Sequence, residues 1–165
     1  MFPYLSYFKF RLSSTNQHGV HSPFVYHYIT QCLYNRPKRS SNKTIDVILK
    51  SISYFKITNC NRGNLALNMQ HEINTKFPKI SSDTPPYDLI LSDAEHLEQQ
   101  YFKLKNLVHN DSMLVVDGIY KTNAAQASWN RLKNDAVITV SIDLFYCGVL
   151  FFRKEQAKEH FKIRI

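Results

Sequence analysis

Two aspartates that follow short apolar runs are the residues best placed to do chemistry in this chain. Asp93 ends the run 87–93, and Asp117 ends the run 112–117. Unbroken apolar runs of this length are typical of strands covered on both faces of a parallel sheet. Residues 95–108 between them have helical spacing, so the three segments predict a βαβ unit. Both carboxylates should therefore lie at the carboxyl edge of one sheet, where open α/β sheets bind ligands.

His96 adds a group that can take a proton at the same edge. It lies one turn into the helix that follows Asp93, and the pKa of histidine suits a general base near neutral pH. Two alternatives stay open, because Asp93 could simply cap that helix and His96 could be a solvated residue of its first turn. The candidate catalytic residues are therefore Asp93, His96 and Asp117, and Tyr120 lies on the loop after Asp117.

A weak first strand is predicted over residues 57–60, followed by a turn over 61–64 that enters a helix. Asn59 lies in this predicted strand, and Asn61 and Gly63 lie in the turn.

Two histidines precede a predicted helix start. Ser22 suits an N-cap and Pro23 suits the first helical position, so the helix should begin there. Helix N-termini attract anions, and His18 and His21 could roof a ligand cleft. The spacing alone favours the alternative that both are capping or surface residues.

The remaining periodicities complete the predicted fold. Helical spacing predicts helices over 4–12, 24–33, 44–55, 65–77, 121–134 and 155–161, and strand spacing predicts strands over 137–145 and 149–152. The tight turn between the last two strands requires them to be antiparallel. In the first helix, Leu5, Phe8 and Leu12 share the face that we expect to pack on the domain. A membrane-surface helix is the alternative, since aromatic and basic residues occur together there.

Size and composition indicate one domain, with residues 1–55 as a helical N-terminal cap and 56–165 as an α/β core. The formal net charge of +8 favours anionic partners without naming one. The basic loop 35–42 makes nucleic acid an alternative partner, although such a run is more often a solvated linker. Three widely spaced cysteines predict reduced thiols and a cytoplasmic protein. No apolar run approaches membrane-spanning length, so no membrane partner is expected.

Several stretches carry a resemblance to a known family. Residues 87–94 (Y-D-L-I-L-S-D-A) resemble the fourth strand of class I S-adenosylmethionine-dependent methyltransferases, and 112–117 resemble the fifth. Residues 18–24 (H-G-V-H-S-P-F) and 151–161 (F-F-R-K-E-Q-A-K-E-H-F) resemble segments of a bacterial O-methyltransferase-like branch. The resemblance implies a Rossmann-like, mostly parallel sheet with a C-terminal antiparallel hairpin. It also implies S-adenosylmethionine as cofactor, held by Asn59, Asn61, Gly63 and Asp93.

The chain departs from that family in its cofactor loop. The family holds the methionine part of the cofactor with a glycine-rich loop of the type E-x-G-x-x-x-G. Here Gly63 is the only glycine of the region, and no Asp or Glu occurs between Asp46 and Glu72. Residues 61–86 are also too few for two more βα units, so the sheet should have fewer than the seven strands usual in the family.

Related O-methyltransferases bind a divalent metal through an Asp after the fourth strand and an Asp-Asn pair after the fifth. The matching positions are Asp93, Asp117 and Gly118, so the Asn is missing. Two carboxylates alone make a poor Mg²⁺ site, and we predict no metal.

The sequence therefore predicts a methyltransferase-like protein that transfers a methyl group from S-adenosylmethionine to an oxygen or nitrogen of an unknown small acceptor. The acceptor would enter between the N-terminal helices and the loops at Asp93 and Asp117. The alternative is a degenerate, non-catalytic relative that serves as a scaffold or partner-binding module, and an RNA-binding module is a weaker one. Because the cofactor loop is incomplete, binding of S-adenosylmethionine should be weak or undetectable.

Overall fold

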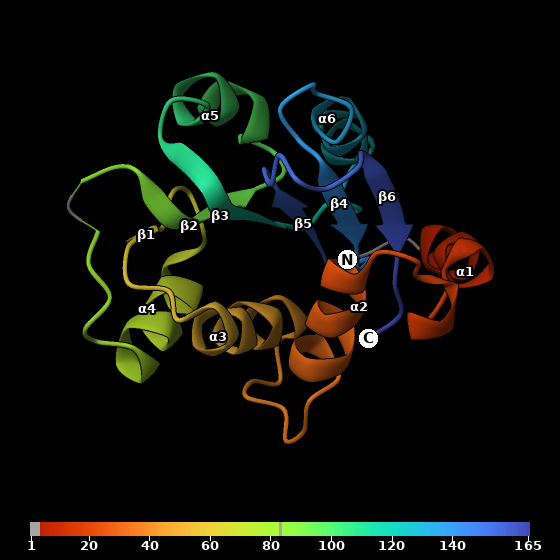
Figure 1. Cartoon of the computed structure of the whole chain (residues 1–165), viewed down its shortest axis with the longest axis horizontal. Helices are drawn as coiled ribbons and strands as arrows, with labels where there is room; N and C mark the ends of the chain where they lie inside the picture. Colours follow the sequence, from red (N-terminus) through yellow and green to blue (C-terminus); the bar gives the residue numbers. More distant parts are fainter. Residues whose placement is uncertain (1–3, 83) are drawn as a thin grey trace.

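The apolar runs of the sequence form the strands of one mixed sheet in the computed structural model, which describes residues 4–82 and 84–165 (Figure 1). In these residues the sheet has six strands in the order β1-β2-β3-β5-β4-β6. Their bounds are β1 Cys60–Asn61, β2 Tyr87–Asp93, β3 Val108–Asp117, β4 Val140–Asp143, β5 Cys147–Phe151 and β6 Glu159–Lys162. The chain is thus an α/β protein, as predicted.

The strand pairing confirms the predicted core. β2 pairs in parallel with β3, which places Asp93 opposite Asp117, and β1 joins β2 in parallel. β5 is antiparallel to both β3 and β4, so the last two predicted strands form an antiparallel pair. β6 extends the sheet in parallel with β4. Consequently β3, β4 and β6 all end at the edge where Asp93 and Asp117 lie.

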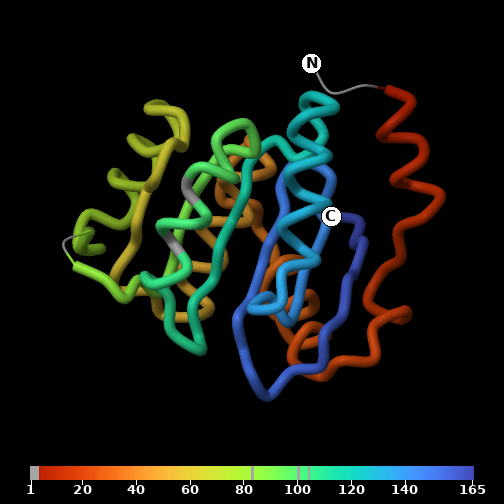
Figure 2. Tube along the Cα trace, turned by 90° about the horizontal axis from the view of Figure 1, so that it is seen from above, coloured from red at the N-terminus to blue at the C-terminus, as the bar shows by residue number. Residues whose placement is uncertain are grey.

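Helices cover both faces of the sheet. α2 (Pro23–His27), the π-helix η2 (Tyr28–Leu33), α3 (Lys43–Phe55) and α4 (Leu67–Lys76) lie on one face, and α5 (Leu97–Leu104) and α6 (Asn123–Leu132) lie on the other (Figure 1). The N-terminal helices α2 and α3 therefore form a packed layer. α1 (Tyr4–Ser13) stands at one end of the molecule, close to β6 (Figures 1 and 2).

The sheet separates two hydrophobic cores, and successive residues of a strand point alternately into one core and the other. Leu89, Leu91, Val115 and Val149 point to the helices α2 to α4, while the intervening residues, such as Ile90 and Leu114, point to α5 and α6. Because both faces are buried, the strands read as continuous apolar runs in the sequence.

The predicted helix start at Ser22 is confirmed. The Ser22 hydroxyl accepts a hydrogen bond from the Val25 N–H, and Pro23 opens the helix. Asn42 caps α3 in the same way through the Ile45 N–H. At the other end of α3, Lys56 closes the helix in the left-handed conformation, with φ of +54°. Local caps therefore define where α2 and α3 begin and where α3 ends.

The C-terminal helix predicted over residues 155–161 is wrong, because Glu159–Lys162 forms strand β6. Phe161 packs against the core and Ile163 is fully buried, whereas His160 faces the hydroxyl of Ser141 on β4. This alternation is that of a strand. A partner distant in the sequence, the open side of β4, decides the structure of this segment.

The packing face predicted for α1 is also wrong. Phe10 is the buried residue of this helix, and Tyr7 packs with it against Phe145 at ring-centroid distances of 4.9 and 5.4 Å. Leu5, Phe8 and Leu12 face away from the domain, with exposed fractions of 77%, 63% and 73%. α1 thus has an apolar stripe on each side, and the more aromatic one packs on the domain.

The first prediction concerns Gly148, which lies on β5 beneath the indole of Trp129. A Cβ atom at this position would stand 2.3 Å from a ring carbon of Trp129. Gly148→Ala should therefore lower the free energy of unfolding by about 1–3 kcal/mol, the usual cost of overpacking, as measured by urea denaturation. In a Trp129→Leu background, where the ring is gone, the same change should cost much less. An equal cost in both backgrounds would contradict the proposed clash.

Candidate functional site

The carboxyl edge of the sheet brings together the three predicted catalytic residues, Asp93, His96 and Asp117. Asp93 and Asp117 end neighbouring strands in register, and the Ala94 N–H donates to the Asp117 carbonyl at 2.9 Å. β1 ends at Asn61, which lies opposite Ile90 and three residues before the level of Asp93. The first turn of α3 reaches the edge through Thr44. The predicted convergence of the two aspartates is thus present.

The Asp117 carboxylate is tied to the protein through both oxygens. The Thr44 hydroxyl donates to Oδ1 at 2.6 Å, and the Lys121 ammonium donates to Oδ2 at 2.7 Å. The side chain is only 12% exposed. A buried carboxylate with a hydroxyl on one oxygen and an ammonium on the other is held in one orientation. Asp117 therefore joins the end of β3 to the start of α3, which is a structural role.

Asp93 both caps the turn that follows it and orients His96. Its Oδ1 accepts the N–H groups of Glu95 and His96, each at 2.9 Å, and the same carboxylate lies 2.9 Å from Nδ1 of His96. The imidazole is about half exposed, at 51%. When Nδ1 donates to the carboxylate, Nε2 carries the lone pair, which is the tautomer of a general base. The capping role and the catalytic arrangement are compatible.

The residues predicted to bind the cofactor are largely bonded to their own loops. The Asn59 amide donates to the carbonyls of Thr84 and Pro86, and its oxygen accepts from the Ser81 hydroxyl. Asn61 Oδ1 accepts the Gly63 N–H at 2.9 Å, and Gly63 has φ of +48°. These contacts stabilise the loops on either side of β1 and use the groups that a ligand would need.

Tyr120 belongs to the core beneath the edge. Its hydroxyl donates to Oδ2 of Asp143 at 2.6 Å, and its ring stacks on Phe145 with 4.9 Å between centroids. Asp143 also accepts the Phe145 N–H and is 5% exposed. Burial raises the pKa of the Asp143 carboxyl above its ordinary value, against the lowering effect of these hydrogen bonds and of nearby lysines. Both residues anchor the turn between β4 and β5.

The structure does not bring His18 and His21 to Asp93 and Asp117. The N–H of Thr15 donates to the Lys162 carbonyl at one end of β6, and Ser22 bonds Gln156 ahead of its other end. The segment that holds both histidines therefore runs alongside β6. Because strands lie about 4.8 Å apart, four strand spacings put it roughly 19 Å from β3. Both imidazoles belong to exposed residues.

Two residues of this edge were missed by reasoning from the sequence. Lys121 lies four residues after Asp117, and this spacing is a usable signal for an ion pair. Thr44 lies 73 residues from Asp117, and no local pattern connects the two.

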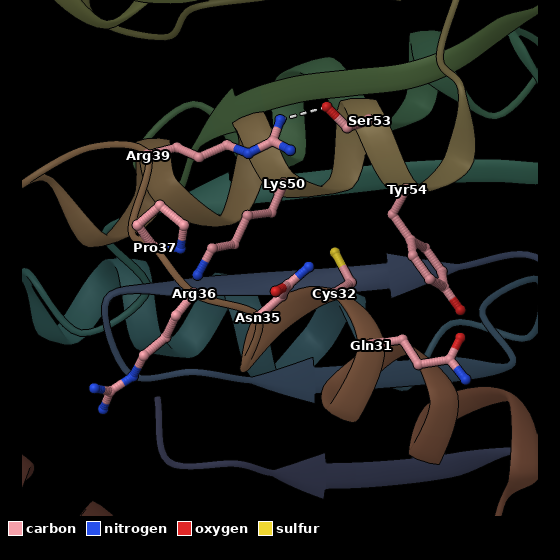
Figure 3. Close-up of a pocket in the computed structure, with 9 residues that line it drawn as sticks. All are labelled: Gln31, Cys32, Asn35, Arg36, Pro37, Arg39, Lys50, Ser53 and Tyr54. Atoms are coloured by element: carbon pink, nitrogen blue, oxygen red, sulfur yellow. Dashed lines mark hydrogen bonds between the residues drawn. The ribbon is translucent and has the colours of Figure 1, made fainter.

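A separate cavity of about 350 Å³ lies between η2 and α3 (Figure 3). Its cations already have partners: the Arg39 guanidinium bonds Ser53 and the Leu49 carbonyl, and Lys50 bonds Asp46 and the Leu33 carbonyl. Arg36 points away from the centre (Figure 3). Burial raises the pKa of the Cys32 thiol to about 12, so this thiol is a poor nucleophile. The cavity offers no free reactive group among these side chains.

Across the described part of the chain, no three His, Cys, Asp or Glu side chains form a group that could hold a metal ion. Within the same residues, no helix has the length and apolar character needed to cross a membrane. Comparison with protein-family models, with curated proteins and with solved structures finds no match.

The role of Asp117 predicts the effect of Thr44→Val. The substitution keeps the shape and removes the hydroxyl that bonds a buried carboxylate, so the free energy of unfolding should fall by about 1.5–3 kcal/mol. Thr30→Val is the control, since the exposed Thr30 hydroxyl donates only to the carbonyl of Tyr26 one turn earlier. Urea denaturation of both variants tests this, and equal small losses would show that the Asp117 contact contributes little.

The buried Asp143 predicts a pH dependence of stability. Because its pKa is raised in the folded state, the native protein binds more protons than the unfolded chain in the window above the ordinary pKa of aspartate. Its contribution to stability is therefore greatest at low pH and declines as pH rises through that window. The Asp143→Asn variant has no carboxyl group at this position and therefore lacks this pH-dependent contribution to stability.

Urea denaturation between about pH 4 and pH 7 should show wild type losing stability relative to Asp143→Asn as pH rises. A difference that stays constant, or that changes in the opposite direction, would mean that the bonds from Tyr120 and Phe145 outweigh burial.

Proposed function

We propose that this chain is a methyltransferase-like protein that retains the scaffold of the class I S-adenosylmethionine-dependent enzymes and has lost tight binding of the cofactor. The strand arrangement supports the scaffold. Three parallel strands, β1 to β3, are followed by an antiparallel β5 placed between β3 and β4. The described sheet has six strands, one fewer than the seven usual in that family, and the support is a likeness of fold only.

The proposed loss of tight cofactor binding rests on the contacts of the residues predicted to hold the cofactor. A nucleoside cofactor with an ammonium group needs free acceptors at the first loop and a free carboxylate for its ribose. Asn59 and Asn61 are bonded to neighbouring loop atoms, and Asp117 is bonded through both oxygens. Asp93 has its Oδ1 shared among three donors. The residues present therefore do not fit the cofactor.

An active methyltransferase is the second candidate, favoured by one observation. The Asp93–His96 pair has the geometry of a general base that could take the proton of an oxygen or nitrogen acceptor. This function requires the cofactor to bind at the loops beside it. Cofactor binding therefore discriminates the two candidates.

Calorimetric titration with S-adenosylmethionine is the test. Loss of two charge-assisted hydrogen bonds, at about 1.5–3 kcal/mol each, should weaken binding by roughly two to four decades. We expect weak or undetectable binding, with any residual affinity abolished in Asp93→Ala. The matched control is Asp111→Ala, because Asp111 lies in β3 at the opposite end from Asp117 and its side chain is 63% exposed.

Micromolar binding by wild type would overturn the proposal and restore the active enzyme. Micromolar binding that survives Asp93→Ala would in addition move the cofactor away from the carboxyl end of β2.

A further inference from the structure

The outer face of α1 is an apolar stripe that nothing in the described part of the chain covers. Tyr4, Leu5, Phe8 and Leu12 are exposed by 82%, 77%, 63% and 73%. Single exposed apolar residues are ordinary, but four that share one face of one helix form a surface. The opposite face of the helix, through Tyr7 and Phe10, already packs on the domain. The stripe is therefore free to contact something else.

Basic residues border this stripe on both sides. Successive side chains are about 100° apart around a helix, so the four apolar residues occupy one sector of roughly 100°. Tyr4 and Leu5 bound this sector. At about 100° per residue, Lys9 lies about 40° outside it on the Leu5 side, and Arg11 lies about 20° outside it on the Tyr4 side. An apolar stripe flanked by cations is the pattern of a helix that lies in the plane of a membrane interface.

The net charge of the protein belongs to the first 45 and the last six residues of the sequence. Residues 1–45 and 160–165 hold eight Lys and Arg and no Asp or Glu, while residues 46–159 hold thirteen of each sign. The entire formal net charge of +8 thus resides in these two segments.

Contacts within the protein bring cations of these segments to α1. Lys162 donates to the Ser13 hydroxyl at 3.2 Å, and Arg164 lines a cavity together with Tyr7 and Arg11. Lys43 donates to the Ile165 carbonyl and lies over the ring of Tyr146, which packs on Tyr7. The helix therefore sits within a positive region rather than carrying two isolated charges.

We propose that the outer face of α1 docks the protein on an anionic lipid surface, with Leu5, Phe8 and Leu12 inserted at the interface. A second copy of the chain fits less well. A face about 15 Å long and about 10 Å wide provides far less than the ~800 Å² per partner of a standard dimer, and the like charges around it would repel. This inference is independent of cofactor binding.

Sedimentation with vesicles tests the proposal on the full chain. Wild type should bind vesicles of phosphatidylcholine with 30% phosphatidylserine, bind pure phosphatidylcholine much more weakly, and lose binding as salt rises from about 0.1 M to about 0.5 M. Phe8→Ser/Leu12→Ser should weaken binding at least tenfold. Lys9→Ala/Arg11→Ala should weaken it roughly thirtyfold, because each basic residue near an anionic surface contributes about 1 kcal/mol.

The matched control is Leu67→Ser/Phe102→Ser, which removes two side chains that are equally exposed, at 82% and 81%, on other helices. This variant should bind like wild type. A blue shift of indole emission in Phe8→Trp on the anionic vesicles would report insertion directly.

Three results would overturn the proposal. One is failure of wild type to bind the anionic vesicles. Another is equal binding to both kinds of vesicle. The third is a concentration-dependent dimer, seen by analytical ultracentrifugation and lost in Phe8→Ser/Leu12→Ser, which would assign the face to a second copy.

Discussion

The bond between Thr44 and Asp117 is the contact on which the arrangement of this protein depends. A carboxylate at the end of a central strand is buried, and burial of a charge is costly unless donors surround it. Here one donor comes from α3 and another from the loop after β3. Meeting this requirement fixes the first turn of α3 over the end of the sheet, and with it the position of the helical layer.

The same contact explains why the edge differs from an open ligand site. In open α/β sheets the carboxyl ends of the strands bound a crevice. Here α3 reaches Asp117, and α1 packs on the turn between β4 and β5 through Phe145. The polar groups near the first loop bond to one another. The Asp93–His96 pair stays accessible at this edge, with the His96 side chain 51% exposed.

The sequence predicted the structure correctly where local signals within a segment determine it. Strand β2 begins and ends at the predicted residues, and Ser22 begins its helix, because apolar runs and caps are local signals. The errors arose where a distant partner decided. Residues 159–162 form a strand because β4 offers an unpaired side, and α1 turns its Tyr7 and Phe10 face inward because Phe145 lies there. The pairing of Asp93 with Asp117 could be predicted, whereas the Thr44 partner could not.

The two borders of the sheet have a consequence for the behaviour of the protein at high concentration. An open strand border presents a row of unpaired N–H and carbonyl groups that can template aggregation. β1 is only two residues long, and Ser81 accepts the Cys60 N–H beside it. On the other side, Thr15 bonds the backbone of both Lys162 and Arg164 along β6. A short bridge thus covers one end of each border, which shortens the row of open backbone groups that another molecule could pair with.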